Sequence, residues 1–303
     1  GRLQVSVDRT PDGDGSDGLR DLGGFVGDNV GTIARTEARG AVLADTVSSV
    51  VSYNAGGHTG RNDGTIEESR ASGRVEVSFE GFPGAGIRGD LGGFAGQNGS
   101  LIRRTAATGS VTGLSTAVSF NAGGHTGLNF GTISDSYARG GVRADGQSSA
   151  VGGFVGVEQS GTTVARSYSI GPVSAPGGGT AGGFAGLSFG VISASFWNTQ
   201  TSGTTQSAGG TGLTTAQFQD YDTFFDTFVA AGWDQLNTWA PGTTGRYPGL
   251  YATERVILAF PEAPISLTYG ESAPGNVTGS FVGGPSAYAF APSGDTVSTA
   301  EVF

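Results

Sequence analysis

The chain has 303 residues, including 57 Gly, 16 Arg, no Lys, no Cys and 26 Asp or Glu, and its net charge is −10. Gly is far above its usual share of about 7%, but it follows no three-residue period, which excludes collagen, and no apolar run approaches the ~18 residues of a membrane-spanning helix. The acidic charge disfavours nucleic acid and anionic membranes as partners, and the absence of Cys excludes disulfides and thiolate zinc sites.

Near the start of the chain, Asp12, Asp14 and Asp17 form a short acidic loop rich in Gly. Their spacing partly matches a calcium-binding nonapeptide, but that site needs stacked copies, and the equivalent loop at 84–86 has no acid. An EF-hand is excluded because Asp17 stands where Gly is required. A Ca²⁺ site at these three residues is therefore an alternative to the solvated loop that we expect, and we predict no other cofactor.

A repeated unit of about 30 residues determines the architecture. The pattern Gly-Gly-aromatic-or-His-x-Gly occurs six times, at intervals of 29 to 36 residues. Downstream of each copy runs Ile-x-x-Ser-x-Ala-x-Gly-x-Val or a close variant, with the two-residue steps of a strand that buries one face. Such a unit must stack on its neighbours to bury that face. The sequence therefore predicts an all-β solenoid of about six coils with parallel strands.

Aliphatic residues at one position of every repeat are predicted to form an internal ladder. Stacked coils place like residues over like, about 4.8 Å apart. A hydroxyl residue follows three positions later, and small residues fit the corners of the coil. The predicted ladder consists of Ile33, Ile66, Ile102, Ile133, Val164 and Ile192.

Asn and His residues also recur at fixed positions. The Asn residues are predicted to form a turn ladder, because Asn tolerates left-handed backbone conformations and can hydrogen-bond along the stack. His58 and His125 alternate with Phe in the anchor pattern and should lie two coils, or ~9.6 Å, apart, too far to share a metal ion. We expect both imidazoles to stack beside Phe rings. The predicted amide ladder consists of Asn29, Asn62, Asn98 and Asn129.

Catalytic groups are hard to find in this sequence. Glycan-cleaving enzymes need an acid and a base that face one groove. The candidate carboxylates fall on different coils and faces, and Glu67 and Glu68 should point to opposite sides of a strand. Neither His is paired with an acid and a nucleophile as a triad requires. We therefore predict no catalytic residues and no enzyme. The carboxylates weighed are Asp28, Asp63, Glu67, Glu68 and Glu158.

Tyr137, Tyr168 and Phe196 directly follow the hydroxyl position in the last three repeats. Alternation along the strand turns these side chains outward, where aromatic rings can stack on sugars. An exposed aromatic patch tends to mark an interface. We predict a surface site here for a glycan or for another copy of the chain, and the alternative is rings that only stabilise a sheet face. If residues 197–250 cover the rings, the binding hypothesis fails.

After Phe196 the repeat stops and the composition changes. Thr214 and Gln217 form a capping box, and apolar residues at helical spacing up to Gly232 predict one short amphipathic helix laid on the solenoid end. Trp233 and the aromatic residues after it would complete an aromatic cap. The predicted boundaries are a β-helix at 1–199, a cap at 200–250, a linker at 251–264 and a partial β-sandwich-like module at 265–303.

Several motifs resemble those of known bacterial proteins. Gly-Gly-Phe-Val-Gly-Asp-Asn-Val-Gly-Thr-Ile at 23–33 and Ser-Tyr-Ala-Arg-Gly-Gly-Val at 136–142 are similar to the GLUG motif of surface and secreted proteins. Residues 196–250 resemble the segment that ends the repeat in filamentous-haemagglutinin-like adhesins. Residues 267–274 look like the opening of the Gly-rich (MBG-like) β-modules that often follow. The two His residues and the broken fifth repeat at 158–163 depart from the pattern.

This resemblance implies a right-handed parallel β-helix in a secreted or outer-membrane-tethered bacterial adhesin, exported by two-partner secretion. Because residue 1 falls in mid-coil and the chain has no Met, we expect a piece of a longer protein. Its expected partners are neighbouring domains or copies of the same protein, with glycans or cell-surface receptors in addition. We predict a non-catalytic stalk and adhesive module. The alternatives are a self-assembling filament subunit and a glycan-cleaving β-helix enzyme.

Overall fold

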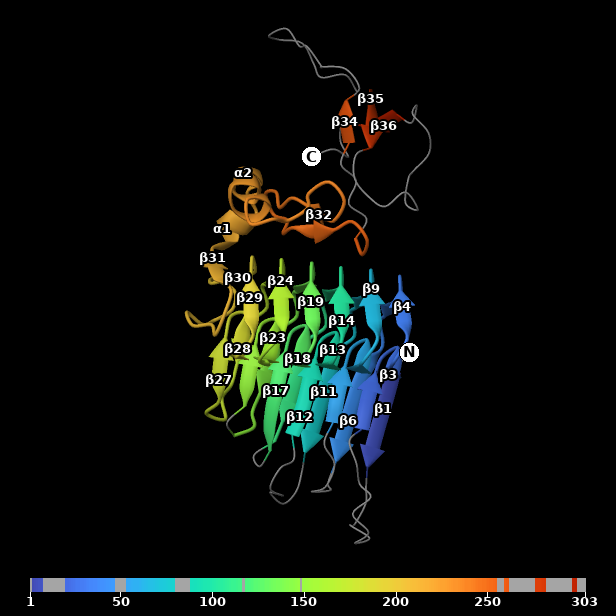
Figure 1. Cartoon of the computed structure of the whole chain (residues 1–303), viewed down its shortest axis with the longest axis vertical. Coiled ribbons are helices and arrows are strands. Elements are labelled where there is room, and N and C mark those ends of the chain that lie inside the picture. The colour runs from blue at the N-terminus through green and yellow to red at the C-terminus, as the bar shows by residue number, and fades with distance from the viewer. Residues whose placement is uncertain are drawn as a thin grey trace.

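The computed structural model describes residues 2–7, 20–46, 53–79, 88–115, 118–147 and 149–254, together with three short strands nearer the C-terminus. Strands from successive repeats pair in parallel, so that the chain winds into five stacked sheets, which we call A to E in the order in which one coil visits them (Figure 1). The predicted all-β parallel solenoid is confirmed. Among the described residues, no helix has the length and apolar character needed to cross a membrane.

The strands of the five sheets are short and follow the sequence repeat. Sheet A contains β1 (Arg2–Val7), β6 (Ala41–Thr46), β11 (Val75–Phe79), β16 (Val111–Leu114), β21 (Val142–Ala144) and β26 (Val173–Ser174). Sheet B contains β2 (Arg20–Gly23), β7 (Tyr53–Gly56), β12 (Arg88–Gly92), β17 (Ser119–Gly123), β22 (Ala150–Gly152) and β27 (Thr180–Gly182). Sheet C contains β3 (Val26–Asn29), β8 (Thr59–Asn62), β13 (Ala95–Asn98), β18 (Thr126–Asn129), β23 (Val155–Glu158) and β28 (Ala185–Ser188).

Sheets D and E complete the coil. Sheet D contains β4 (Thr32–Ala34), β9 (Thr65–Glu67), β14 (Leu101–Arg103), β19 (Thr132–Ser134), β24 (Thr163–Ala165) and β29 (Val191–Ser193). Sheet E contains β5 (Glu37–Ala38), β10 (Arg70–Ala71), β15 (Ala106–Ala107), β20 (Tyr137–Ala138), β25 (Tyr168–Ser169), β30 (Phe196–Asn198) and β31 (Thr211–Leu213).

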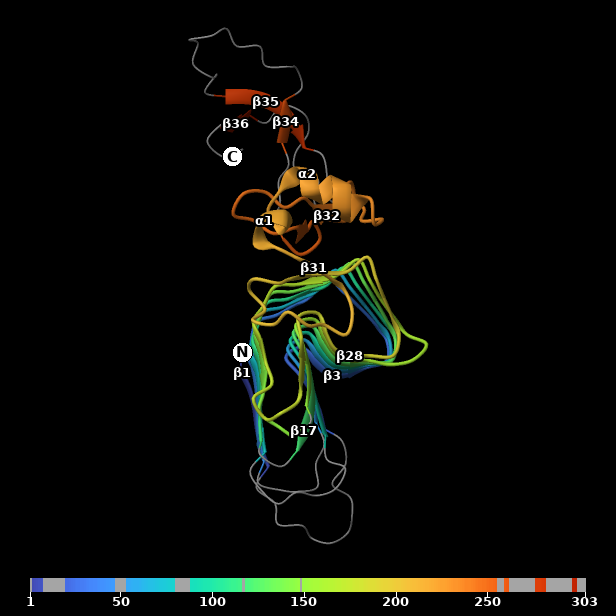
Figure 2. The same cartoon turned by 90° about the vertical axis from the view of Figure 1, so that its left-hand side faces the viewer.

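Two separate cores run along the stack. Sheets A and B lie face to face over one core, which includes Val75 and Tyr53, while sheets C, D and E close around a second core (Figure 2). The second core holds the aliphatic column, in which each side chain lies in register with the next. Ile66, Ile102 and Ile133 are completely buried there. The structure thus places all six predicted ladder residues in one column of sheet D.

The Gly pairs of the anchor pattern lie where the backbones of successive coils are in close contact. A Cβ atom added to Gly93 would lie 2.2 Å from the carbonyl oxygen of Gly124, much closer than any carbon atom can come. The same contact recurs at the other anchor pairs except the last, where a Cβ on Gly183 would instead meet the ring of Trp197. Gly is therefore required by backbone contact at this position, which explains why the pattern repeats.

The corner between sheets D and E is built from residues with a left-handed backbone. Among the described residues, the positive φ angles of non-Gly residues, between 47° and 55°, all occur at this corner. The expectation that the Asn ladder would use left-handed conformations is wrong, since none of its members is among them. The corner residues are Arg35, Glu68, Arg104, Asp135, Arg166 and Ala194.

A non-repetitive segment follows the solenoid. It contains α1 (Thr215–Phe218), α2 (Tyr221–Thr223), a π-helical stretch (Phe224–Val229) and an antiparallel pair of β32 (Trp239–Ala240) and β33 (Gly249–Leu250). The capping box at Thr214 is present. The single predicted helix is wrong, because Asp220 caps a second helical start by accepting from the backbone N–H of Thr223.

The position of this segment also differs from the prediction. Viewed along the stack, it lies beside the solenoid, next to sheet E, rather than across its end (Figure 2). Residues 202–208 instead lie against the last coil, where Gly183 N–H donates to the carbonyl oxygen of Gln206 and Ala208 N–H donates to that of Ala185. We call residues 214–254 the side cap.

The described part of the C-terminal region is a small antiparallel sheet. Its strands are β34 (Ala259–Pro261), β35 (Asn276–Phe281) and β36 (Thr296–Ser298). Most of the predicted module at 265–303 lies outside the described residues, as does the acidic loop with Asp12, Asp14 and Asp17. The calcium alternative and the predicted domain boundaries therefore stay predictions.

Candidate functional site

The three aromatic residues predicted as a surface site form a column on the outer face of sheet E. Tyr137 pairs in register with Tyr168, which pairs with Phe196, and the two Tyr rings stack with centroids 5.3 Å apart. Yet Tyr137 and Tyr168 are fully buried, and Phe196 is 5% exposed. The prediction of an exposed aromatic patch is therefore wrong, because another part of the chain covers all three rings.

The cover is the side cap. Phe228 packs on Phe196 with ring centroids 4.5 Å apart, and Trp239 lies 5.9 Å from the Tyr168 ring. The rings of Trp233 and Trp239 pack with centroids 4.2 Å apart, and Trp233 belongs to the same buried cluster. Burial on this scale stabilises the contact mainly through apolar area and aromatic packing. The predicted cap residues thus do form an aromatic cluster, but on the flank of the solenoid.

A polar latch fixes the far edge of the side cap. Tyr137 donates its hydroxyl to the carboxylate of Glu254, and Arg139 forms an ion pair with the same carboxylate at 2.9 Å. Tyr168 Oη donates to the carbonyl oxygen of Pro248 at 2.6 Å, and Arg139 Nη2 donates to the same oxygen at 2.9 Å. Burial raises the pKa of both Tyr hydroxyls, so they remain donors.

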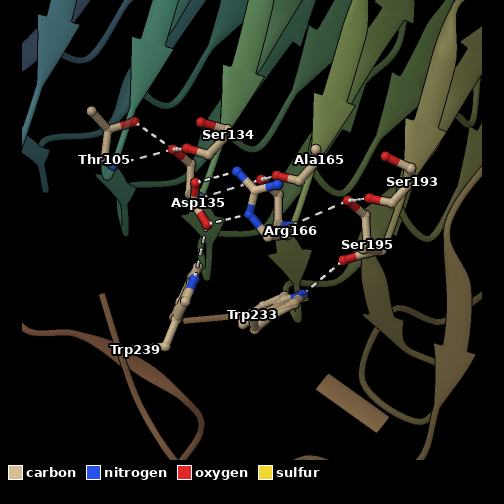
Figure 3. A network of polar contacts seen from close by, with 12 residues as sticks. Thr105, Ser134, Asp135, Ala165, Arg166, Ser193, Ser195, Trp233 and Trp239 are labelled. Atoms are coloured by element: carbon tan, nitrogen blue, oxygen red, sulfur yellow. Dashed lines mark hydrogen bonds and ion pairs between the residues drawn. The ribbon is translucent and has the colours of Figure 1, made fainter. Parts of the chain in front are cut away.

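A second polar contact joins the side cap to the left-handed corner (Figure 3). Arg166 binds Asp135 through two parallel contacts of 2.8 Å, and Trp239 Nε1 donates to Asp135 Oδ1 at 3.4 Å. Trp233 Nε1 donates to the carbonyl oxygen of Ala194 at 2.8 Å. Both indole N–H groups therefore find partners on the solenoid, which orients the two rings over sheet E.

Charges of alternating sign follow the left-handed corner from coil to coil. Glu68 lies between Arg35, at 3.8 Å, and Arg104, at 3.0 Å. Arg104 also reaches Glu67 at 3.1 Å, so Glu67 and Glu68 share one guanidinium. The expectation that these two carboxylates point to opposite sides of a strand is wrong, because the positive φ of Glu68 ends the alternation of the strand. The alternating signs at one repeat position were a signal in the sequence that pattern reasoning missed.

The two imidazoles stack within a column of aromatic rings. His58 lies between Phe25 and Phe94, with ring centroids 5.0 and 4.7 Å away, and His125 lies between Phe94 and Phe154, at 5.1 and 4.7 Å. The expected stacking role is confirmed. Each imidazole also contacts two Thr hydroxyls, so both ring nitrogens are in hydrogen-bonding contact.

Burial lowers the pKa of His58 to about 4 and that of His125 to about 3. The folded chain therefore holds both rings neutral while the unfolded chain protonates them below pH 6.5, so each His destabilises the fold as the pH falls from 6.5 toward 4. We expect a His58→Phe, His125→Phe variant to lose less stability than the parent between pH 7 and 4.5, by about 5 kcal/mol, because each of the two His residues contributes about two pKa units at about 1.4 kcal/mol per unit. Urea unfolding at both pH values measures the difference. Equal losses in the two proteins would contradict the buried neutral state.

The predicted Asn ladder is continuous and ends on a carboxyl group. Each Asn amide donates to the side-chain oxygen of the next Asn at 2.7–2.8 Å, and Asn129 donates to both oxygens of Glu158 at 2.9 and 3.1 Å. Thr162 Oγ1 donates to Glu158 Oε1 at 2.5 Å. Burial raises the pKa of Glu158 to about 7. The broken fifth repeat thus supplies an acceptor that ends a ladder of donors.

The candidate catalytic carboxylates contact different groups, except Glu67 and Glu68, which share Arg104. Glu67 and Glu68 bind Arg side chains, Glu158 ends the Asn ladder, and Asp63 forms an ion pair with Arg61 at 2.7 Å. Asp28 is exposed. In the part of the chain that the structure describes, no three His, Cys, Asp or Glu side chains gather as metal ligands. The described residues therefore form internal side-chain ladders, and the side cap covers the outer face of sheet E.

Comparison with known proteins gives one partial match. A protein of Evansella cellulosilytica named "Putative Gly-rich membrane protein" is 34% identical over 108 residues, which make up 34% of this chain and 12% of that protein. The chain thus spans only a small part of that relative. No protein-family model and no solved structure matches the chain. The similarity is therefore to a stretch of one Gly-rich protein.

Proposed function

We propose that this chain is a non-catalytic, rigid stalk segment of a large bacterial surface or secreted protein. The observation that carries the proposal is the continuity of the side-chain ladders. The aliphatic column, the Phe/His ring column and the Asn amide ladder each link successive coils in the same direction. A stack whose coils are joined by several independent columns resists both bending and separation of the coils.

The surface location is supported by two features. The similar Evansella protein is named a membrane protein, and the motifs at 23–33 and 136–142 resemble GLUG repeats of surface and secreted proteins. On this proposal the chain belongs to a filamentous-haemagglutinin-like adhesin exported by two-partner secretion. Adhesion to glycans or receptors would then use surfaces other than the Tyr137 column, because the side cap covers that column.

The filament alternative receives less support from the last coil. Head-to-tail stacking of copies would need the edge strands β27 and β28 to accept another coil. Residues 206–208 already bond to Gly183 and Ala185 there, and the hydroxyl of Ser207 accepts from the N–H groups of Phe184 and Ala185. Part of the edge that a second copy would use is therefore occupied by the chain itself.

To test the stalk, the whole chain is stretched between handles attached at Thr32→Cys and Val191→Cys. The handles attach only at these two positions because the chain has no Cys of its own. A stalk should resist extension until coils rupture cooperatively, whereas a Gly/Ser-rich coil of equal length should stretch gradually at low force. Gradual extension of the parent would refute the stalk. In a parallel assay, release of reducing ends or unsaturated sugars from glycans would overturn the non-catalytic assignment.

A further inference from the structure

Acids and amides alternate along a column of sheet B whose last three members are buried. Asp21, Asn54, Asp90 and Asn121 lie in register on consecutive strands. Asn54 Nδ2 donates to Asp21 Oδ1 at 2.7 Å, and Asn121 Nδ2 donates to Asp90 Oδ1 at 2.7 Å. The column therefore consists of two amide–carboxyl pairs of the same geometry, stacked one above the other.

The two pairs are not joined to each other. Within the described residues, Asn54 Oδ1 is buried without a hydrogen-bond partner, and the Asn54 side chain is completely shielded from solvent. The next side chain in register is that of Asp90, which is 7% exposed. A carboxylate can only accept hydrogen bonds, so an ionised Asp90 would leave the buried Asn54 oxygen unpaired, which destabilises the folded chain.

A proton on Asp90 would provide a hydrogen-bond donor for the unpaired Asn54 Oδ1. A protonated carboxyl group has one O–H donor and keeps an acceptor oxygen. The Asn ladder of sheet C shows that in-register side chains on neighbouring strands reach each other at 2.7–2.8 Å. We propose that Asp90 is a proton-binding site whose O–H donates to Asn54 Oδ1, joining Asp21, Asn54, Asp90 and Asn121 into one continuous ladder.

The surroundings of Asp90 favour the protonated form. Asn54, Asn121 and Gln97, whose Oε1 lies 3.5 Å from Asn54 Nδ2, are neutral. Beyond Asn121 the column continues with Ala150, which packs with Leu128 and Val157 in an apolar cluster.

Charge and burial act on Asp90 in opposite directions. Burial raises the pKa of Asp90 to about 6, although the hydrogen bond from Asn121 and the charge of Arg88 on the same strand act to lower it. At the far end of the column, burial also raises the pKa of Asp21.

The direction of the pH effect follows from the raised pKa. Between pH 3.8 and about 6 the folded chain holds a proton on Asp90 that the unfolded chain releases. The stabilisation by the completed ladder is full below pH 3.8 and is lost as the pH rises through 6. Over this range the folding equilibrium constant should fall about 100-fold, which corresponds to two pKa units. The proton thus strengthens the stack under mildly acidic conditions.

The first experiment follows the carboxyl titration of Asp90 by NMR in the full chain with ¹³C-labelled Asp, assigned with an Asp90→Asn variant. Asn54→Ala removes the acceptor of the proposed O–H and should lower the pKa of Asp90. Asn121→Ala removes a donor to the ionised form and should raise it. Water that enters either cavity would lower the pKa in both variants, so shifts in the same direction would overturn the proposal.

The second experiment needs no cavity variant. Asp90→Asn provides a permanent amide donor toward Asn54, so its thermal midpoint should exceed that of the parent at pH 7.5 and match it at pH 4. Asp45→Asn, a change at an exposed carboxylate on sheet A, is the control and should follow the parent at both pH values. Contributions of His58, His125 and Glu158 cancel in this comparison. If the pH profiles of Asp90→Asn and the parent run parallel, Asp90 holds no stabilising proton.

Discussion

Replacing Ile133 by Asp should unfold the solenoid at neutral pH. The Ile133 side chain is fully buried between Ile102 and Val164 in register, inside the core enclosed by sheets C, D and E. An unpaired carboxylate there has no hydrogen-bond donor, and burying it costs several kcal/mol, a large share of the stability of a typical domain. Circular dichroism and urea unfolding of the purified variant measure the loss.

Two controls separate the effect of burying a charge from the effects of an exposed charge and of a smaller side chain on this strand. Thr132→Asp introduces the same charge at the exposed neighbouring position and should unfold close to the parent. Ile133→Val, which copies the natural residue of the next coil, should cost about 0.5–1.5 kcal/mol. If Ile133→Asp melted like Thr132→Asp, the aliphatic column would not be the interior of the solenoid.

Replacing Trp233 by Ala should detach the side cap. The indole is 2% exposed, packs against Trp239, Phe228 and Phe196, and donates to the carbonyl oxygen of Ala194. Large-to-small changes at buried aromatic positions cost about 3–5 kcal/mol. We therefore expect rapid proteolysis within residues 214–254, with the solenoid strands still protected.

Leu236→Ala, three residues away and at a 63% exposed position, is the matched control and should leave the proteolysis pattern unchanged. Detachment would also expose the rings of Tyr137 and Tyr168. A Trp233→Ala variant with the same cleavage rate as the parent would show that the aromatic cluster does not hold the side cap on sheet E.

The sequence predicted the coil itself because local periodicity determines which side chains face inward. The two-residue steps after each Ile placed the aliphatic column, and the equivalent positions of His and Phe predicted the ring stack. Both features repeat in every coil, so neighbouring coils impose the same geometry on each copy. The Asn ladder was predicted from its repeat position in the same way, but the left-handed backbone expected for it was wrong.

The site was predicted less well because its geometry depends on contacts between distant parts of the chain. Tyr137 is latched by Glu254, which lies 117 residues away in the sequence, and no local pattern reveals such a contact. Spacing showed correctly that the Tyr rings face away from the coil but not that Trp233 and Trp239 would cover them. Similarly, the proposed role of Asp90 depends on Asn54, which lies in register on the preceding coil.

The most direct test of a rigid stacked stalk is the distance between spin labels at Thr32→Cys and Val191→Cys, measured by pulsed electron paramagnetic resonance. These positions lie at the first and last strands of sheet D, in one column of paired residues. Five strand spacings predict a narrow distribution centred near about 24 Å. A flexible chain of the same length would give a broad distribution around about 70 Å, and that result would contradict a rigid stacked stalk.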